Sequence, residues 1–319
     1  MIVESVRFSI IVPAYNAEAD LESTVRSALE QTNPDLEVII SDDGSSDGTL
    51  AVANALARSD TRIRVVTGEN GGCSVARNRG FSVSRSEFCV LLDAGDRLCP
   101  EYLETMAGFI DARPGFDIYS CNGDRLMAGG RTEPFLSGAA YEVETSWTID
   151  DLIPVDHIFI VAIVRRSMHE RIGGFRSDLR YAEDYDFWLR ALAQGAAHRF
   201  LPERLGVYFE SPTGKSKNRI PHAEAQIRIF EDLAAMPQLT DEERALCAEK
   251  LTALRTRIRR VRLETRIQAG DYRGARAEYL RVRAAYLSLP LYLAGLLIMT
   301  ISPRLYARAF ALRDAARAV

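Results

Sequence analysis

The sequence predicts an α/β fold with a mostly parallel central sheet flanked by helices and a helical extension at the C-terminal end. The first observation is a series of four short apolar runs, rich in β-branched residues, that alternate with segments of helical apolar spacing. The second is a change beyond Pro221 to long helical segments without strand signals. At roughly 150 residues per domain, the length fits a large domain over 1–221 and an extension over 222–319.

The predicted strands and helices follow one another in a regular series. The predicted strands are Phe8 to Val12, Glu37 to Ile40, Ile63 to Thr67 and Phe88 to Leu92. Between the first two, apolar residues from Leu21 to Leu29 recur on one helical face, and Asn33-Pro34 ends that helix. Asp47-Gly48-Thr49 opens the next helix. A βαβ series of this kind favours parallel pairing, because each helix returns the chain to the same edge of the sheet.

The second half of the chain is less regular. Between Pro100 and Pro221 we expect a strand at His157 to Val164 and a helix at about Tyr185 to Gln194, which together complete the sheet. Farther on, Gly270-Asp271 predicts a turn between two antiparallel helices.

Charge is distributed unevenly along the chain. The net charge is -4, but from His222 onward Arg and Lys outnumber Asp and Glu by 17 to 11, so the tail is basic and the rest acidic. The acidic part argues against binding to nucleic acid. The five cysteines form no CxxC pair, which is typical of reduced thiols in a cytosolic protein. The N-terminal segment lacks the features of a signal peptide, so we expect a cytoplasmic protein.

Polar residues follow three of the predicted strands where each strand ends. Val12 is followed by PAYN, Ile40 by SDDGSSDGT and Leu92 by DAGD. In an open parallel sheet, ligands bind beyond the carboxyl ends of the strands. The pattern therefore predicts a binding site at this edge, although Asp42 and Asp43 could also serve only as turn formers.

Six segments in order make the chain resemble the inverting family-two glycosyltransferases, which have the GT-A fold. They are FSIIVPAYN, IISDDGSSDGT, GGCSVARNRG, FCVLLDAGD, IGGF and AEDYDFWLR, and the resemblance covers roughly residues 7 to 220. It implies transfer of a sugar from a nucleotide donor, most simply a UDP-sugar, to a glycan or lipid-linked acceptor. The implied nucleotide-binding residues are Pro13, Tyr15, Asp42, Arg77 and Asp93. From the residues alone, Arg77 could pair with phosphate or with the acidic cluster.

The resemblance also implies a divalent cation, Mg²⁺ or Mn²⁺, at Asp96. Carboxylate oxygens such as those of Asp93 and Asp96 are ligands that these ions prefer, and the cation would neutralise the departing diphosphate. The chain departs from the family pattern at Gly95, where a further aspartate is usual. This departure puts the strength of metal binding and the role of Asp93 in question.

Asp184 in the segment AEDYDFWLR matches the catalytic base of the family. The acceptor hydroxyl must lose a proton as the new bond forms, and a carboxylate can accept it. At the start of a helix, the positive end of the dipole would keep Asp184 ionised. The alternative is that Asp184 or Glu183 only caps this helix.

Two basic or apolar segments remain open to two interpretations each. The loop from Ser211 to Arg219, which contains Lys215 and Lys217, could close over the diphosphate or be a solvated linker. Lys215, Lys217 and Glu183 are the weaker candidates for contact with the acceptor or for a lid. Tyr286 to Ile301 would reach only about 24 Å as a helix, too short to span a bilayer of about 30 Å. Residues 286–310 could instead contact an anionic membrane surface, or pack on the catalytic domain or in a homo-oligomer.

By this resemblance we expect a metal-dependent inverting glycosyltransferase, in the cytoplasm or at the inner face of the membrane. A role in polysaccharide or cell-surface glycan synthesis is implied by the resemblance alone. One alternative is a non-catalytic protein that binds nucleotide sugars and scaffolds an assembly complex, which the loss of an aspartate at Gly95 would favour. A sugar nucleotidyltransferase is a third, but the chain lacks the glycine-rich phosphate loop expected after the first strand.

Overall fold

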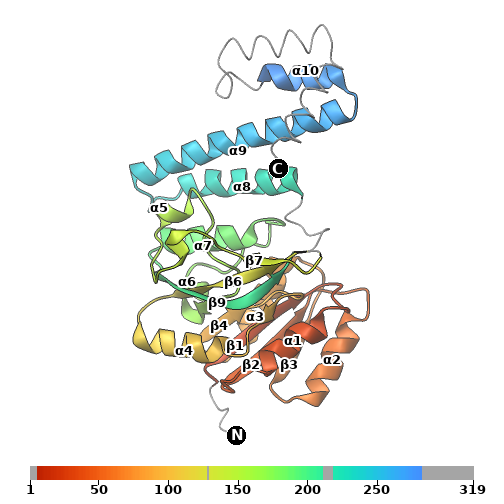
Figure 1. Ribbon diagram of the computed structural model, residues 1–319, viewed down its shortest axis with the longest axis vertical. Helices are drawn as coiled ribbons and strands as arrows, with labels where there is room; N and C mark the ends of the chain where they lie inside the picture. The colour runs from red at the N-terminus through yellow and green to blue at the C-terminus, as the bar shows by residue number, and fades with distance from the viewer. Residues whose placement is uncertain (1–5, 128, 211–217, 282–319) are drawn as a thin grey trace. The chain divides into compact units, whose positions relative to one another are not determined.

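The computed structural model describes residues 6–127, 129–210 and 218–281 (Figure 1). The chain divides into two compact units. The first comprises Met1–Lys217 and Asp232–Cys247, and the second comprises Asn218–Glu231 and Ala248–Val319. Helix α8 (Arg219–Ala234) crosses position 221, and a domain boundary at 221/222 stays a prediction.

The first unit is built on one sheet with the strand order β3-β2-β1-β4-β8-β6-β9-β5, and β7 pairs with β6 (Figure 1). The strands are β1 (Phe8–Ala14), β2 (Leu36–Asp42), β3 (Ile63–Thr67), β4 (Phe88–Leu91), β5 (Arg97–Leu98), β6 (Ile118–Leu126), β7 (Thr132–Pro134), β8 (Ala162–Arg165) and β9 (His198–Phe209). The residues of β1, β2 and β4 are buried throughout. Burial on both faces explains why these strands read as continuous apolar runs rather than as alternating patterns.

The expectation of a mostly parallel sheet holds for one half of it. Strands β3, β2, β1 and β4 are parallel, at the four places predicted from the sequence. Beyond β4 the sheet is mixed, because β8 pairs antiparallel with both β4 and β6 whereas β9 runs parallel to β6. The strand expected at His157 to Val164 was too long. Only Ala162–Arg165 pairs, because the Ala162 amide donates to the Ile160 carbonyl (2.8 Å) in a tight turn that precedes the strand.

Helices connect and cover the strands of the first unit. They are α1 (Leu21–Leu29), α2 (Thr49–Ser59), α3 (Cys73–Val83), α4 (Tyr102–Ala112), α5 (Ile149–Leu152), α6 (Arg166–Arg171) and α7 (Glu183–Ala193), with a 3-10 turn at Ala139–Tyr141. Helix α3 packs on β1 and β2. This approach requires glycine at position 80, since a Cβ there would lie 2.4 Å from Cγ2 of Ile11. Helix α7 agrees with the prediction for Tyr185 to Gln194.

The second unit is helical. It contains most of α8 and α9 (Asp241–Gln268), together with α10 (Tyr272–Arg281). The turn predicted at Gly270-Asp271 is confirmed, and Gly270 has a φ of +74°. Within this unit, Arg255 pairs with Glu231 and Arg262 pairs with Glu224, at 2.6 and 2.7 Å.

The predicted membrane contact at 286–310 lies outside the described residues. Within 6–127, 129–210 and 218–281, no helix combines the length and the apolar character that a membrane span requires. All five cysteines are free thiols.

Candidate functional site

The carboxyl ends of the parallel strands bring the predicted acidic residues to one edge of the sheet. Strand β1 lies between β2 and β4, with Ala14 opposite Asp42 in β2. On the other side, the amide of Leu92 donates to the Ile11 carbonyl (3.1 Å), so Asp93 leaves the sheet beside β1. Asp42 and Asp93 therefore flank the end of the same strand, as the sequence predicted.

Arg77 of helix α3 links two of these acidic segments. Its Nη2 donates to Oδ1 and Oδ2 of Asp93 at 2.8 and 3.0 Å, and its Nη1 donates to Oε1 of Glu183 at 3.3 Å. The Arg77 side chain is only 2 % exposed. Burial acts to lower the pKa of Arg77, but the neighbouring carboxylates, Asp93 first among them, hold it well above its usual value. Of the two partners left open by the sequence, the structure shows the acidic cluster.

Asp96 is a buried carboxyl group with one oxygen left without a partner. It is 4 % exposed, and its Oδ1 accepts a hydrogen bond of 3.0 Å from the Phe209 amide at the end of β9. Its Oδ2 is buried and has no hydrogen-bond partner. The pKa of Asp96 is raised to about 8, first by burial and then by the nearby Asp93 carboxylate, while the Phe209 amide and Arg77 act against the rise.

These features of Asp96 fit a bound divalent cation. Nearby positive charge would relieve the cost of the buried carboxylate, and the free Oδ2 is a hard oxygen ligand. Among the described residues, no group of three or more His, Cys, Asp or Glu side chains is placed to hold a metal ion. Mg²⁺ is often held by only one or two carboxylates together with substrate phosphates, so a sparse protein site suits a cation that arrives with a diphosphate.

The departure at Gly95 has a backbone explanation. The Asp96 amide donates to the Asp93 carbonyl (3.0 Å), which closes a four-residue turn with Gly95 at its third position. Gly95 has a φ of +113°, a conformation that favours glycine. A Cβ at this position would meet no atom within 4 Å, so the obstacle to a larger residue is the backbone conformation and not crowding.

Glu183 and Asp184 occupy the first two positions of helix α7. The preceding Ala182 has a left-handed backbone (φ 54°), so the chain turns sharply into the helix. The N-cap residue Ala182 makes no side-chain hydrogen bond to the helix, whereas Oδ1 of Asp184 accepts from the following Tyr185 amide at 2.8 Å. Burial raises the pKa of Glu183, with Arg77 acting against the rise. Asp184 adds to the negative charge around Arg77, so it lies in the same cluster.

A buried face of α7 anchors this helix start. Tyr185, Trp188, Leu189 and Leu192 are all buried. The hydroxyl of Tyr185 donates to the Leu152 carbonyl at 2.5 Å. Side chains fixed in this way let a carboxylate at the helix start keep one position.

The predicted nucleotide-binding residues differ in their solvent exposure. Pro13 is buried within β1, opposite Ser41, whereas Tyr15 just beyond the strand is 52 % exposed. Asp42 is buried, and its Oδ2 accepts from Oγ1 of Thr67 at 3.0 Å. Tyr15 can therefore offer its ring to a ligand, while Asp42 is held in a fixed orientation. The lid candidates Lys215 and Lys217 lie outside the described residues.

The structure gives supporting contacts to Asp43, which the sequence indicated only as a turn former, and to Asn78, to which it gave no role. Asp43 accepts from the amides of Gly71 and Gly72 at 3.1 and 2.7 Å and so orders the loop before α3. Asn78 bonds both the amide and the carbonyl of Phe175 (2.9 and 2.7 Å). Asp43 and Asn78 lie within the sequence motifs that carry the family resemblance, and this position was the only sign in the sequence of their importance. Thr24 of α1, which bonds to the backbone of Gly95 and Asp96, lies outside these motifs.

Comparison with known proteins gives a match to one family. The profile of Glycosyl transferase family 2 matches residues 9–173, slightly more than half of the chain. A protein named "Uncharacterized glycosyltransferase EpsJ" from Bacillus subtilis is 32% identical over 224 residues, which are 68% of this chain and 64% of that protein. The "Putative teichuronic acid biosynthesis glycosyltransferase TuaG" of the same organism is 31% identical over 204 residues, 63% of this chain and 77% of that protein. This chain thus spans just under two thirds of EpsJ.

Two solved structures are similar in fold at low sequence identity. S. aureus TarS 1-349 in complex with UDP-GlcNAc has a TM-score of 0.63 at 21% identity, covering 79% of this chain and 72% of that one. The mannosyltransferase PcManGT from Pyrobaculum calidifontis, in complex with GDP-Man and Mn²⁺, has a TM-score of 0.62 at 20% identity, covering 98% and 88%.

Proposed function

The chain belongs to glycosyl transferase family 2, and from this premise we propose that it transfers a sugar, with inversion, from a nucleoside diphosphate donor to a hydroxyl group of a glycan or lipid-linked acceptor. Its fold is the GT-A fold expected from the sequence. One observation carries the proposal: the buried Arg77 joins Asp93 on the strand edge to Glu183 at the start of α7. One arginine thus links Asp93, proposed for the donor side, to the neighbour of Asp184, the proposed base.

The donor would bind at the ends of β1, β2 and β4. The exposed ring of Tyr15 can stack on the base, and the oriented carboxylate of Asp42 can accept hydrogen bonds from base or ribose. A UDP-sugar is our preferred donor. The complexes of TarS with UDP-GlcNAc and of PcManGT with GDP-Man support a nucleotide sugar as the class of donor.

Asp96, with Asp93 beside it, would hold Mg²⁺ or Mn²⁺ against the diphosphate. The unpartnered Oδ2 of Asp96 supports this role, as does Mn²⁺ in the PcManGT complex. The cation would neutralise charge on the departing diphosphate. Asp93 would retain its bonds to Arg77, which keeps its carboxylate beside the site.

Asp184 would act as the general base in a single displacement. As the acceptor oxygen bonds to the anomeric carbon, the bond from that carbon to the donor phosphate oxygen breaks and the nucleoside diphosphate leaves. The proton of the acceptor hydroxyl passes to a carboxylate oxygen of Asp184. Attack opposite the leaving group inverts the configuration. The neighbouring Glu183, partly buried and bonded to Arg77, would border the acceptor side.

The proposal includes the cellular context. The name of EpsJ supports a glycosyltransferase, and that of TuaG, which refers to teichuronic acid biosynthesis, supports a role in polysaccharide or cell-surface glycan synthesis. We place this activity in the cytoplasm at the inner face of the membrane, where lipid-linked acceptors are available. Contact of residues 286–310 with the membrane, and homo-oligomerisation, belong to the same proposal.

Donor turnover by two variants tests the assignment. In the presence of Mn²⁺ we expect Asp184→Asn to lower kcat by about 10²–10⁴, the range for loss of a general base. Asp96→Ala should abolish Mn²⁺-dependent binding of UDP in a calorimetric titration. Wild-type turnover by either folded variant would refute the role given to that residue. If the wild type binds UDP with Mn²⁺ but turns over no nucleotide sugar, the non-catalytic scaffold function replaces the enzymatic one.

A further inference from the structure

Helix α1 presents a polar row to the segment that follows Asp93. Thr24 and Ser27 are three residues apart and lie on one face of α1, and Gln31 follows just beyond the end of the helix at Leu29. The Leu98 amide donates to Oγ of Ser27 (3.2 Å). Gln31 donates to the Cys99 carbonyl (2.8 Å). The row therefore bonds to the backbone of the segment from residue 95 onward.

Thr24 makes the contacts of this row that reach the Asp93–Asp96 turn. Its Oγ1 accepts a hydrogen bond from the Gly95 amide (2.9 Å) and donates one to the Asp96 carbonyl (2.9 Å). Thr24 is completely buried. One hydroxyl group thus holds the two polar backbone groups that flank the peptide between Gly95 and Asp96.

Asp96 is consequently held from two sides. Thr24 holds its backbone from α1, and the Phe209 amide holds its Oδ1 from the end of β9. Oδ2 is the carboxylate atom left over. Metal affinity depends on groups that orient a ligand as well as on the ligand itself, and their removal typically weakens binding 10–100-fold.

We propose that Thr24 is a positioning residue for the cation site, because its hydroxyl holds the Asp93–Asp96 turn in the conformation that presents Oδ2 of Asp96. This inference rests on the proposed role of Asp96 in binding a divalent cation. Gly95 makes the turn flexible in the absence of such a restraint, since glycine adopts many backbone conformations. The restraint from α1 compensates for that freedom.

Mn²⁺ affinity in the presence of saturating UDP tests the proposal. Free Mn²⁺ is measured by electron paramagnetic resonance with the full chain, so the readout does not depend on turnover. We expect Thr24→Val, which replaces the hydroxyl by a methyl group, to weaken Mn²⁺ binding about tenfold. Thr24→Ser keeps the hydroxyl and should bind within about twofold of the wild type, well inside the range expected for loss of an orienting group.

Ser27→Ala is the matched control. It removes a hydroxyl from the same row of α1, but one that bonds to Leu98 beyond the turn, so Mn²⁺ affinity should stay that of the wild type. Equal affinity of Thr24→Val and wild type would overturn the positioning role and leave the proposed function intact. Failure of the wild type to bind Mn²⁺ with UDP would overturn the role of Asp96 itself.

Hydrogen exchange of the wild type covers the case in which Thr24→Val does not fold. The Gly95 amide should exchange slowly without ligand, because it donates to a buried oxygen, and more slowly with Mn²⁺ and UDP. Exchange of this amide at the rate of exposed loop amides would overturn the proposal.

Discussion

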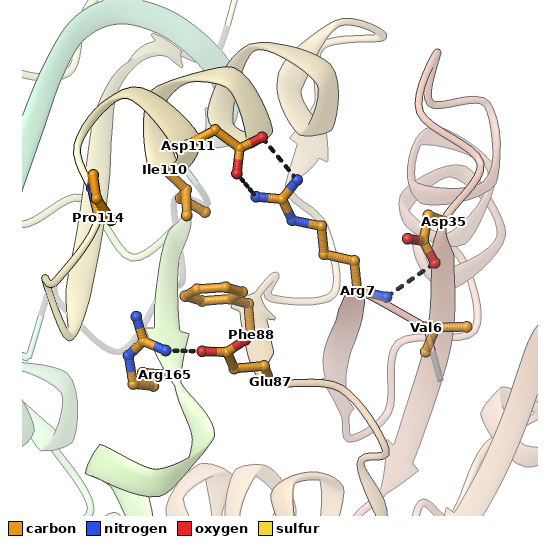
Figure 2. Close-up of a pocket in the computed structure, with 9 residues that line it drawn as sticks. All are labelled: Val6, Arg7, Asp35, Glu87, Phe88, Ile110, Asp111, Pro114 and Arg165. Atoms are coloured by element: carbon orange, nitrogen blue, oxygen red, sulfur yellow. Dashed lines mark hydrogen bonds and ion pairs between the residues drawn. The ribbon is translucent and has the colours of Figure 1, made fainter. Parts of the chain in front are cut away.

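Arginine–carboxylate pairs lie at both ends of the parallel strands in the first unit, but their surroundings differ. The amino edge is the side of the sheet where these strands begin, and the carboxyl edge is the side where they end. At the amino edge, nine residues line a pocket of about 550 Å³ (Figure 2). There Arg7 pairs with Asp111 and Arg165 pairs with Glu87, as the dashed lines in Figure 2 mark. At the carboxyl edge, Arg77 pairs with Asp93 and Glu183.

The amino-edge pairs are satisfied and partly solvated. Arg7 also donates to the Ala107 carbonyl, and Arg165 donates to the Phe116 carbonyl. The Asp111 side chain is 66 % exposed. Asp111 has a lowered pKa because it accepts hydrogen bonds from Arg7. A pair of this kind is typical of a protein surface and contributes little to stability.

The carboxyl edge is buried and incomplete. Arg77 is almost fully buried and its Nε has no partner, and the same is true of Oδ2 of Asp96. Buried polar groups are nearly always hydrogen-bonded in folded proteins, so these two unpartnered atoms set the carboxyl edge apart from the amino edge and fit the ligand site proposed there. The comparison teaches that unsatisfied burial, more than the presence of a pocket, distinguishes the candidate site.

The largest difference in stability between the two edges should appear when Arg77 is replaced. Arg77→Met leaves Glu183, whose side chain is only 13% exposed, without its counter-charge, and we expect the free energy of unfolding to fall by about 3–5 kcal/mol. The measurement is urea unfolding at pH 7. A loss no larger than that of a matched amino-edge variant would mean that the two edges do not differ in the way described.

Acid should destabilise the first unit through a buried histidine, His198 of β9. His198 is buried, its Nδ1 accepts from the Trp147 amide, and its Nε2 bonds to Oγ of Ser120 (2.8 Å). Burial lowers the pKa of His198 to about 3, from 6.5. The unfolded chain therefore takes up the proton first, so the stabilisation is complete above pH 6.5 and is lost progressively as the pH falls toward 3.

Urea unfolding at pH 7 and pH 4.5 measures this acid response. Between these values the neutral state of His198 should account for a loss of about 2–3 kcal/mol. His169, with a pKa lowered to about 4 by burial, adds to the loss in the wild type. His198→Gln is less stable at pH 7 but should lose less on acidification. The same acid loss in this variant as in the wild type would contradict the assignment.

Replacement of Asp96 should increase the free energy of unfolding, by a smaller amount than the losses above. Asp96→Asn removes a buried carboxyl group whose ionisation burial disfavours, so the ligand-free protein should gain about 1 kcal/mol in free energy of unfolding. Thermal unfolding with Mn²⁺ and UDP should then show no added stabilisation, unlike the wild type. A variant that is less stable without ligand and still stabilised by Mn²⁺ with UDP would show that Asp96 is only structural.

The smallest effect belongs to the amino edge. Arg7→Met removes a partly exposed pair with Asp111 and should lower the free energy of unfolding by less than about 1 kcal/mol. Donor turnover should remain that of the wild type, because the pair lies at the opposite edge of the sheet from Asp93. A loss of turnover in the folded variant would give the amino-edge pocket a function.

Much of the first half of the fold could be predicted from local patterns. The four parallel strands stood out because each is buried on both faces and therefore apolar along its whole length. The helix at Glu183–Ala193 stood out through its apolar periodicity. The strand near His157 was misjudged because the apolar residues before Ala162 are buried without belonging to the sheet.

The candidate site could be predicted in its residues but not in its bonding. Motif order indicated Asp93, Asp96 and Asp184. The hydrogen bond from the Phe209 amide, 113 residues away, to Oδ1 of Asp96 could not be predicted, nor could the lack of a partner for Oδ2. Thr24 looked like an ordinary helix residue, and only its position opposite the Gly95 amide shows otherwise.

The sequence by itself determined the chemistry available to this protein: acidic residues at strand ends, an arginine in α3 and a glycine in the turn before Asp96. Only the tertiary structure decided which of these charges are satisfied. The reason is that local order follows from backbone propensity and apolar periodicity over a few residues, while burial and hydrogen bonding depend on segments that meet across the whole fold.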